Sequence, residues 1–312
     1  MLLSQWLARD CALNQRSILT NSEKPSAKAG GFSICTVNIP TSVNQMALDP
    51  NLVSTYKRDG VVVLRDLVSP DAIEQLRHGV EANMKSPGPW ANEYTPAGAS
   101  GRFFDDYVNW QRIPQFEQIG NTGSVSQAAL DLMATQSARM FHEHVLVKEA
   151  QTREVTPWHH DDPYYGVDGM DNVSIWIPLD PIPESVALRF IVGSHLWNKR
   201  FIPRRFADQS AYVDQAKDFV TLPDQSELDA FPSITCPVNL GDAVAFHFRT
   251  LHAAPGTLGT EVDLRRAVSF RYVGDDAVFA SRPWRTSPPL EGNGLSFGEP
   301  LDDPRFPIVA TR

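Results

Sequence analysis

The sequence predicts a mainly β fold, a jelly roll flanked by helices, and three observations carry this prediction. Short apolar segments with the two-residue period of strands recur between residues 143 and 273. Segments with helical periodicity are grouped nearer the N-terminus, between residues 52 and 141. The 24 prolines and 19 glycines are spread along the chain, as expected of a fold with many turns. Many short strands beside a group of helices are typical of a jelly roll with a helical flank.

Composition narrows the class of protein. The 312 residues are 42% hydrophobic and 21% charged, which suits a globular protein, and we expect residues 46–312 to form a single domain. The net charge of −9 argues against a nucleic-acid partner. No apolar run is long enough to cross a bilayer, which argues against a membrane partner. The three cysteines, Cys11, Cys35 and Cys236, lack CxxC spacing and fit a reducing compartment.

Residues 1–45 predict a flexible N-terminal extension. Ser, Lys, Pro and Gly dominate most of it, and the apolar residues 2–8 are too few for the hydrophobic region of a signal peptide. A mitochondrial transit peptide is the alternative, but Asp10 and Glu23 count against it because transit peptides are poor in acidic residues. We therefore expect a cytoplasmic protein rather than one imported into mitochondria.

The domain is expected to begin with a helix, a strand and a second helix. Residues 52–60 read as a short helix ended by Gly60, and residues 61–64 as a buried strand. Ser69 is a suitable cap for the next helix, with proline at the first helical position. The buried stripe of that helix is formed by Ile73, Leu76 and Val80.

Two further segments complete the N-terminal half. Residues 102–112 mix aromatic and charged side chains and read as a loop, which either lines a pocket or packs on the core. We favour the pocket, with Phe104 as a candidate contact for a substrate. Residues 125–141 predict another helix, with Leu130 and Met133 facing inward.

Strands are expected to dominate from about residue 143. In residues 143–148, Val145 and Val147 share one face, whereas His144 and Lys148 share the other, which faces either a polar cavity or solvent. The further strands are predicted at residues 173–179, 188–192, 243–248 and 265–273.

A long insertion, residues 198–233, interrupts these strands. Insertions of this length in a compact domain are usually functional or disordered. We interpret this one as a lid. Its basic start contains Arg204, which either binds an anionic group of a substrate or is a solvated charge.

The chemistry is concentrated in the run at residues 156–165, TPWHHDDPYY. Side chains two apart on a strand share a face, so either His159 with Asp161 or His160 with Asp162 can offer a metal one imidazole and one carboxylate. The best candidate for a third ligand is His252. Two histidines and one carboxylate leave half of the metal open, which is the arrangement of non-haem Fe(II) oxygenases.

Five stretches in order, TPWHHDDPYY, VSIWIPLDPIPE, FIVGSH, GDAVAFHFRTLHAAPG and LRRAVSFRY, carry a family resemblance. The chain resembles the phytanoyl-CoA dioxygenase family of Fe(II)- and 2-oxoglutarate-dependent enzymes, from about Val53 to the C-terminus. The resemblance implies a double-stranded β-helix (a cupin-like jelly roll), with His159, Asp161 and His252 as ligands of Fe(II) and with 2-oxoglutarate and O2 as cosubstrates. The family usually has Gln where this chain has His160.

The resemblance also implies roles around the metal. Arg265 matches the arginine that binds the distal carboxylate of 2-oxoglutarate, and Arg266, which faces the other way on a strand, is the alternative. Trp176 and Lys148 are the other expected cosubstrate contacts. The candidate substrate contacts are Tyr164, Tyr165, Phe104 and Arg204. His195 and His247 are expected to be structural.

The expected reaction is hydroxylation of an unactivated C–H bond of a small-molecule metabolite, with release of succinate and CO2. Halogenases of this chemistry lack the carboxylate ligand, so Asp161 favours hydroxylation. Two alternatives remain open: a non-catalytic jelly-roll protein that binds or regulates, and a zinc-dependent hydrolase on the same ligands.

Overall fold

The computed structural model describes residues 47–206, 208, 210–290 and 294–312. Asn44–Arg312 forms a compact unit. The predicted extension at residues 1–45 lies outside the described residues. No helix in the described part of the chain is both long and apolar enough to cross a membrane.

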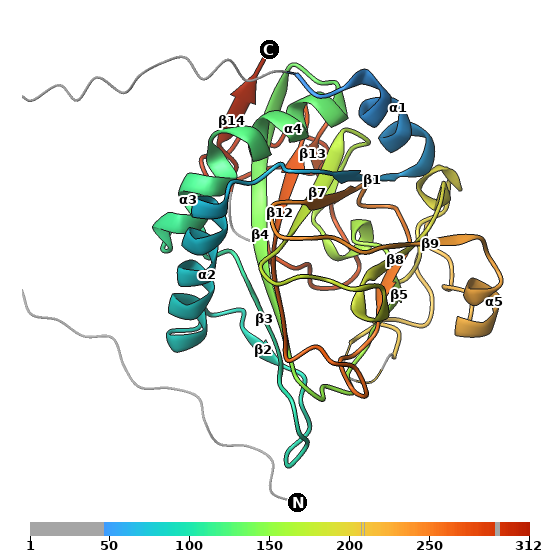
Figure 1. Ribbon diagram of the computed structural model, residues 1–312. Helices are drawn as coiled ribbons and strands as arrows, with labels where there is room; N and C mark the ends of the chain where they lie inside the picture. The colour runs from blue at the N-terminus through green and yellow to red at the C-terminus, as the bar shows by residue number, and fades with distance from the viewer. Residues whose placement is uncertain (1–46, 207, 209, 291–293) are drawn as a thin grey trace, which may run out of the picture. The chain divides into compact units, whose positions relative to one another are not determined.

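Two antiparallel sheets form the centre of this unit (Figure 1). The main sheet runs in the order β1 (Val61–Leu64), β10 (Ala243–Phe246), β7 (Asn172–Pro178), β12 (Leu264–Val273), β4 (Ser137–Glu149), β3 (Phe103–Tyr107), β2 (Asn92–Glu93), and β14 (Ile308–Thr311) also pairs with β4. The second sheet runs in the order β5 (Thr156–His159), β11 (His252–Ala254), β8 (Leu188–Ile191), β9 (Ser233–Cys236). A short pair joins β6 (Val167–Asp168) to β13 (Val278–Phe279). The predicted jelly roll is confirmed.

The helices cover the outer face of the main sheet. They are α1 (Pro50–Asp59), α2 (Pro70–Lys85), α3 (Pro114–Asn121) and α4 (Ser124–Met133), while the short α5 (Gln225–Asp229) belongs to the insertion. Gly60 ends α1 in the left-handed conformation, at φ 76°, which costs glycine little. Ser69 caps α2 by accepting a hydrogen bond from the backbone of Ala72 at 3.2 Å. Both predicted helix ends are confirmed.

Two predicted elements are wrong in type or length. The helix expected at residues 125–141 ends at Met133, because Ala134 takes a left-handed conformation (φ 58°) and β4 begins three residues later. Leu130 and Met133 are buried as predicted. Residues 102–112 are not all loop: residues 103–107 form β3, which pairs with β4 and is held in the sheet.

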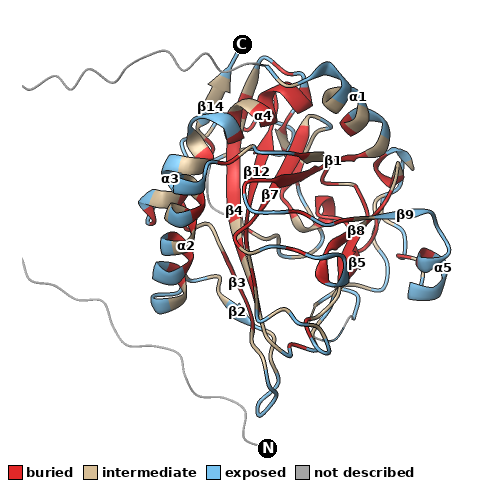
Figure 2. Ribbon diagram, in the orientation of Figure 1, coloured by how far each residue is buried: buried red, intermediate tan, exposed pale blue. Residues whose placement is uncertain are grey.

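The two faces of the main sheet differ in chemistry. Its outer face belongs to the largest apolar core, where the side chains of α2 and α4 pack on Ile175, Val268 and Phe270. Its inner face carries an apolar cluster around Trp176 and Phe190, and polar side chains beside it. Figure 2 shows the central strands of the main sheet, such as β7 and β12, buried and the helices exposed on their outer sides. The polar inner face is where a site can form.

Candidate active site

Two side chains of the central motif and the distal histidine come together between the sheets. His159 ends β5, Asp161 lies two residues beyond it, and His252 begins β11 directly opposite His159. One ligand atom from each lies within 4.8 Å of the others, and all three residues are buried. His159 Nδ1 lies 2.8 Å from the carbonyl of Pro157, and His252 Nδ1 lies 2.9 Å from that of Thr250. These hydrogen bonds orient each imidazole ring so that its Nε2 faces the other two possible ligands.

Asp161 reaches this group by a turn rather than by strand alternation. The strand ends at His159, and Asp161 has helical dihedral angles at the start of a 3₁₀ helix. Its Oδ1 lies 3.6 Å from His159 Nε2 and 3.8 Å from His252 Nε2. Its Oδ2 accepts from Ser174 Oγ at 3.2 Å and lies 3.5 Å from Arg271 Nε. The carboxylate therefore turns one oxygen toward the two imidazoles while the other is held by the main sheet.

The charges around Asp161 keep it ionised. Burial opposes ionisation, but the Arg271 guanidinium and the two imidazoles outweigh it and hold the pKa of Asp161 well below its usual value. Burial is also the main reason that the pKa of His252 is lowered to about 3, with a smaller effect from His159. At neutral pH the group therefore presents a carboxylate and an unprotonated His252, the forms that bind a metal.

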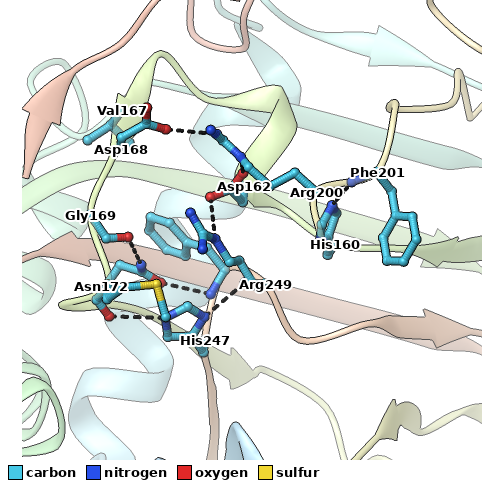
Figure 3. Close-up of polar contacts among 12 residues, drawn as sticks. His160, Asp162, Val167, Asp168, Gly169, Asn172, Arg200, Phe201, His247 and Arg249 are labelled. Carbon is cyan, nitrogen blue, oxygen red and sulfur yellow. Dashed lines mark hydrogen bonds and ion pairs between the residues drawn. The ribbon is translucent and has the colours of Figure 1, made fainter. Parts of the chain in front are cut away.

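The rival pair, His160 and Asp162, points elsewhere (Figure 3). His160 Nε2 accepts a hydrogen bond from the backbone of Phe201 at 3.0 Å, and burial lowers its pKa to about 4. Asp162 forms ion pairs with Arg200 at 2.7 Å and Arg249 at 2.9 Å. These contacts attach the motif to the start of the insertion and to Arg249, and neither His160 nor Asp162 belongs to the group of possible ligands found among the described residues. The structure therefore brings His159 and Asp161 together with His252, whereas His160 and Asp162 lie outside this group.

The two remaining histidines of interest are engaged with the backbone. His247 Nε2 lies 3.0 Å from the carbonyl of Met170, and its Nδ1 accepts from the backbone of Arg249 at 3.0 Å. His195 Nε2 lies 3.2 Å from the carbonyl of Lys57. Both stay outside the group of possible ligands found among the described residues. Their positions agree with the predicted structural role.

A cavity of about 290 Å³ opens on His159, Asp161 and His252 and also contains Arg265. Arg265 is buried, with Nε donating to the carbonyl of Val186 at 2.9 Å and with Nη2 lacking any hydrogen-bond partner among the described residues. Its neighbour Arg266 faces the helices and pairs with Asp180 at 2.8 Å. The predicted alternation is therefore present, and Arg265 is the member of the pair that can meet a ligand in the cavity.

The sequence profile of the phytanoyl-CoA dioxygenase (PhyH) family matches residues 56–267, which include these elements. The chain belongs to the phytanoyl-CoA dioxygenase family. It is thus a 2-oxoglutarate-dependent dioxygenase, whose cofactor is Fe(II) and whose cosubstrates are 2-oxoglutarate and O2. No curated protein sequence matches the chain.

Solved structures show the same fold as this phytanoyl-CoA dioxygenase family member. The carbocyclase SnoK from nogalamycin biosynthesis is 23% identical, with a TM-score of 0.64 over 84% of this chain and 97% of SnoK. The epimerase SnoN, in complex with Fe3+, α-ketoglutarate and nogalamycin RO, is 19% identical, with a TM-score of 0.66 over 84% of this chain and 98% of SnoN. EctD from S. alaskensis, with 2-oxoglutarate and 5-hydroxyectoine, is 16% identical, with a TM-score of 0.59 over 83% and 87% of the two chains.

The other two expected cosubstrate contacts of this dioxygenase lie beside Arg265. The Arg265 guanidinium is 5.2 Å from the ring centroid of Trp176, a cation–π distance. Lys148 lies directly across from Arg265 in the sheet register and also lines the cavity. Its Nζ contacts Thr156 Oγ1 and the carbonyl of Pro255, both at 3.2 Å. Burial, with a smaller effect of Arg265, holds the pKa of Lys148 well below its usual value.

Three of the four candidate substrate contacts line the cavity: Tyr164, Tyr165 and Arg204. Phe104 does not, and this expectation is wrong. Because residues 103–107 form a strand, neighbouring side chains face opposite sides, so Phe104 packs in the core under the helices and Phe103 faces the cavity.

Several cavity residues of this dioxygenase were not predicted. His142 and Tyr107 come from β4 and β3, and Phe206 of the insertion packs on His159 with ring centroids 4.9 Å apart. Arg271 lies on the same face of β12 as Arg265, and its Nη2 is 3.3 Å from His144 Nδ1. The signal for Arg271 was present in the sequence, because it lies an even number of residues after Arg265 on one strand.

A hydrogen-bonded chain continues outward from Arg271. His144 Nε2 lies 3.1 Å from Asp105 Oδ2, which also accepts from Tyr94 Oη at 3.0 Å. Asn92 of β2 donates to the other oxygen of Asp105 at 2.8 Å. This chain connects the β2–β3 hairpin to Asp161 and orders one wall of the cavity.

Proposed function

We propose that the protein hydroxylates an unactivated C–H bond of a small-molecule metabolite and releases succinate and CO2. The observation that carries the proposal is the presence in one cavity of two groups suited to 2-oxoglutarate chemistry. One is the convergence of His159, Asp161 and His252. The other is Arg265, a buried guanidinium with an unpartnered nitrogen.

The donor set fits iron. Two imidazole nitrogens and one carboxylate oxygen converge from one side, which is the ligand set of non-haem Fe(II) oxygenases. The hydrogen bonds from Nδ1 of each histidine to a backbone carbonyl leave Nε2 as the ligand atom. Ser174 and Arg271 hold Asp161 through the oxygen that faces away from the imidazoles. We propose His159, Asp161 and His252 as the metal ligands.

The cosubstrate site is proposed at Arg265. A buried guanidinium with an unpartnered Nη2 is suited to the distal carboxylate of 2-oxoglutarate. The Trp176 ring packs against the Arg265 guanidinium, and the hydrogen bond from Arg265 Nε to the carbonyl of Val186 fixes the position of that guanidinium. Lys148 adds a third polar group at this end of the cavity. Arg266 has its carboxylate partner on the helical side and takes no part.

When bound, iron would activate O2, the oxidant of the reaction, and 2-oxoglutarate would supply two of the four electrons that reduce it, with the substrate C–H bond supplying the other two. The protein supplies position and shelter. Tyr164 and Phe206 pack around His159, with ring centroids 6.0 and 4.9 Å from its own. These rings exclude water from the side of the cavity where we propose that the substrate lies.

Two alternatives are weaker for specific reasons. A zinc-dependent hydrolase on the same ligands needs a general base, but the candidates predicted from the sequence, His160 and Asp162, are turned away and engaged. A binding protein without catalysis does not explain why Arg265 is buried without a carboxylate. The solved structures of similar fold include a carbocyclase, an epimerase and EctD with bound 5-hydroxyectoine. We propose hydroxylation rather than halogenation because Asp161 supplies a carboxylate to the metal group.

The test is release of succinate from 2-oxoglutarate by protein loaded with Fe(II) under anaerobic conditions and then exposed to O2. A panel of small metabolites is screened, and an active one should raise succinate release and gain one oxygen atom in its mass. Protein without iron is the control. A product that gains no oxygen would replace hydroxylation with another oxidation, and succinate release without iron would contradict the proposal.

We also propose that the insertion at residues 198–233 is a lid. Arg204 and Phe206 line the cavity, while Arg200 is fixed by Asp162 and by Asp168, each at 2.7 Å (Figure 3). Because two ion pairs hold Arg200, we expect the start of the insertion to stay in place while the residues that follow Arg200 move. Hydrogen exchange within residues 203–222 should slow when iron, 2-oxoglutarate and substrate bind. Equal protection in the free and bound protein would contradict this role.

A further inference from the structure

The arginines of this chain separate into two groups by their partners. Most described arginines lie within 4.0 Å of a carboxylate oxygen. Those without such a partner among the described residues are Arg153, Arg204, Arg205, Arg265 and Arg285. Arg204, Arg205 and Arg265 all line the metal cavity. Guanidinium groups that lack a carboxylate within 4.0 Å are therefore gathered at the place where a ligand would bind.

The carboxylates of the cavity cannot neutralise them. The acidic residues in its lining are Asp105 and Asp161. Asp105 accepts from Asn92 and Tyr94 and contacts His144, and Asp161 is held by Ser174 and Arg271. The distal carboxylate of 2-oxoglutarate accounts for Arg265 under the proposed function. Arg204 and Arg205 remain without a carboxylate within 4.0 Å, and Asp224 and Asp208 act on them only at longer range.

Both guanidinium groups donate to carbonyls of the insertion itself, so each has a defined position within that segment. Arg204 Nη2 donates to the carbonyl of Leu222 at 2.9 Å, and its backbone N–H and carbonyl both bond the hydroxyl of Tyr164, at 3.1 and 2.6 Å. Arg205 is exposed, and its Nη1 donates to the carbonyl of Ala211 at 2.9 Å. Its guanidinium also lies 4.9 Å from the centroid of Tyr212. Preorganised donors lose less entropy when a ligand binds.

The positive charge of Arg204 and Arg205 is opposite in sign to the net charge of the whole chain. The chain as a whole carries a net charge of −9, so its average field repels anions. Tyr164 joins the arginines to the metal group, because its ring packs on His159 while its hydroxyl bonds Arg204. A ligand held by Arg204 and Arg205 would therefore extend toward the proposed metal.

We propose that the substrate carries an oxyanion, a carboxylate or a phosphate monoester, which Arg204 and Arg205 bind. Guanidinium groups offer paired donors that match the oxygens of either group. The cavity of about 290 Å³ must also hold 2-oxoglutarate, so the part of the substrate that enters it is small. The inference rests on the proposed function and deepens it by naming the class of substrate.

The experiment measures binding to full-length protein loaded anaerobically with Fe(II) and saturating 2-oxoglutarate. The probes are matched sets of small molecules in which only the charged group changes: a carboxylate, its carboxamide, a phosphate monoester and the corresponding alcohol. Ligand-observed NMR gives the affinities for wild type and for the double variant Arg204→Gln/Arg205→Gln. Arg153→Gln is the matched control, because Arg153 is an exposed arginine that also lacks a carboxylate partner but lies outside the cavity.

The expected result is that at least one anionic series binds about tenfold or more tightly than its neutral counterpart. The double variant should lose that preference, whereas Arg153→Gln should keep it. Whether acids or phosphate esters are preferred identifies the source of the oxyanion. Equal binding of charged and neutral members, no binding by any anionic member, or a preference that survives in the double variant would each overturn the inference.

The affinity for 2-oxoglutarate, measured alone, separates this inference from the proposed function. It should be unchanged in the double variant. If it falls there as we expect it to fall in Arg265→Ala, the two arginines serve the cosubstrate and the inference is overturned while the proposed function stands. If wild type binds no 2-oxoglutarate, the proposed function fails and takes the inference with it.

Discussion

The two faces of strand β12 show how one segment serves stability on one side and chemistry on the other. The outward residues Val268 and Phe270 are buried in the apolar core beneath the helices, and the outward Arg266 is paired with Asp180. The inward residues Arg265 and Arg271 line the cavity. Arg265 keeps an unpartnered nitrogen, whereas its neighbour Arg266 bonds both oxygens of Asp180.

This difference teaches how to recognise a site inside a β fold. On the outward face every polar group has its partner in the protein, as burial demands. On the inward face some polar atoms, among them Ser269 Oγ and Arg265 Nη2, are buried without one. Unpaired buried groups are costly, so their concentration on one face of one strand indicates that a ligand completes them.

The largest effect is expected at the metal group. Asp161→Ala removes the only carboxylate of that group and leaves two imidazoles, so Fe(II) binding should be lost. His160→Gln should bind Fe(II) as wild type does, because His160 faces Phe201 and belongs to the structural side of the motif. Anaerobic metal titration of both variants decides this. Loss of binding in His160→Gln with retention in Asp161→Ala would reverse the assignment of the two faces.

The next largest effect is a loss in the free energy of unfolding, expected from a change on the outward face of β12. Phe270→Ala deletes a fully buried ring from the core and should lower the free energy of unfolding by about 3–5 kcal/mol. Ser269→Ala, one residue away on the inward face, should change it by about 1 kcal/mol or less, because the hydroxyl has no partner to lose. Denaturant unfolding of the two variants is the measurement. Similar losses would show that both faces contribute equally to the core.

The paired arginines give the corresponding test of binding. Arg265→Ala should weaken 2-oxoglutarate binding by about 2–5 kcal/mol, which is well over tenfold, because a carboxylate would then be buried without its partner. Arg266→Ala should bind 2-oxoglutarate nearly as wild type does. Isothermal titration at saturating iron distinguishes them. If Arg266→Ala is the damaged variant, or if neither is, Arg265 is not the cosubstrate contact.

The smallest effect concerns His247, a buried histidine whose partners are all in the protein. Burial, with a smaller effect of His195, lowers its pKa to about 3 from the usual 6.5. Between these values the unfolded chain binds a proton that the folded chain does not, so the free energy of unfolding falls as the pH falls. From pH 7 to pH 5 this contribution is about 2 kcal/mol.

The variant His247→Gln removes that titration. Its free energy of unfolding should therefore fall by about 2 kcal/mol less than that of wild type between pH 7 and pH 5. Denaturant unfolding at the two pH values measures the difference. An identical fall in both proteins would mean that His247 is protonated in the folded state.

Much of this arrangement could be predicted from the sequence, because strand alternation and helix capping are local rules. The opposite orientations of Arg265 and Arg266 follow from the two-residue period, and Ser69 and Gly60 mark helix ends by their own chemistry. The three proposed ligands could also be predicted from the sequence. Strand alternation does not explain the position of Asp161, however, because the strand ends at His159 and a turn places the carboxylate beside the imidazoles.

The rest depends on contacts that are distant in the sequence. Residues 103–107 were expected to be loop. They form a strand because they pair with β4, which lies about 40 residues later in the chain, and the local sequence does not reveal that pairing. Phe104 was consequently assigned to the wrong side. The unpartnered state of Arg204 and Arg265 is likewise a property of the folded chain, since it requires knowing where every carboxylate lies.

The central claim is that the metal group and Arg265 together hold 2-oxoglutarate, and its most direct test is the affinity for 2-oxoglutarate with and without Fe(II) under anaerobic conditions. If both groups contact the same molecule, iron should raise that affinity by about 5- to 150-fold, and 2-oxoglutarate should raise the affinity for iron by the same factor. Asp161→Ala should abolish the effect of iron. Equal affinity with and without Fe(II) in the wild-type protein would contradict the account.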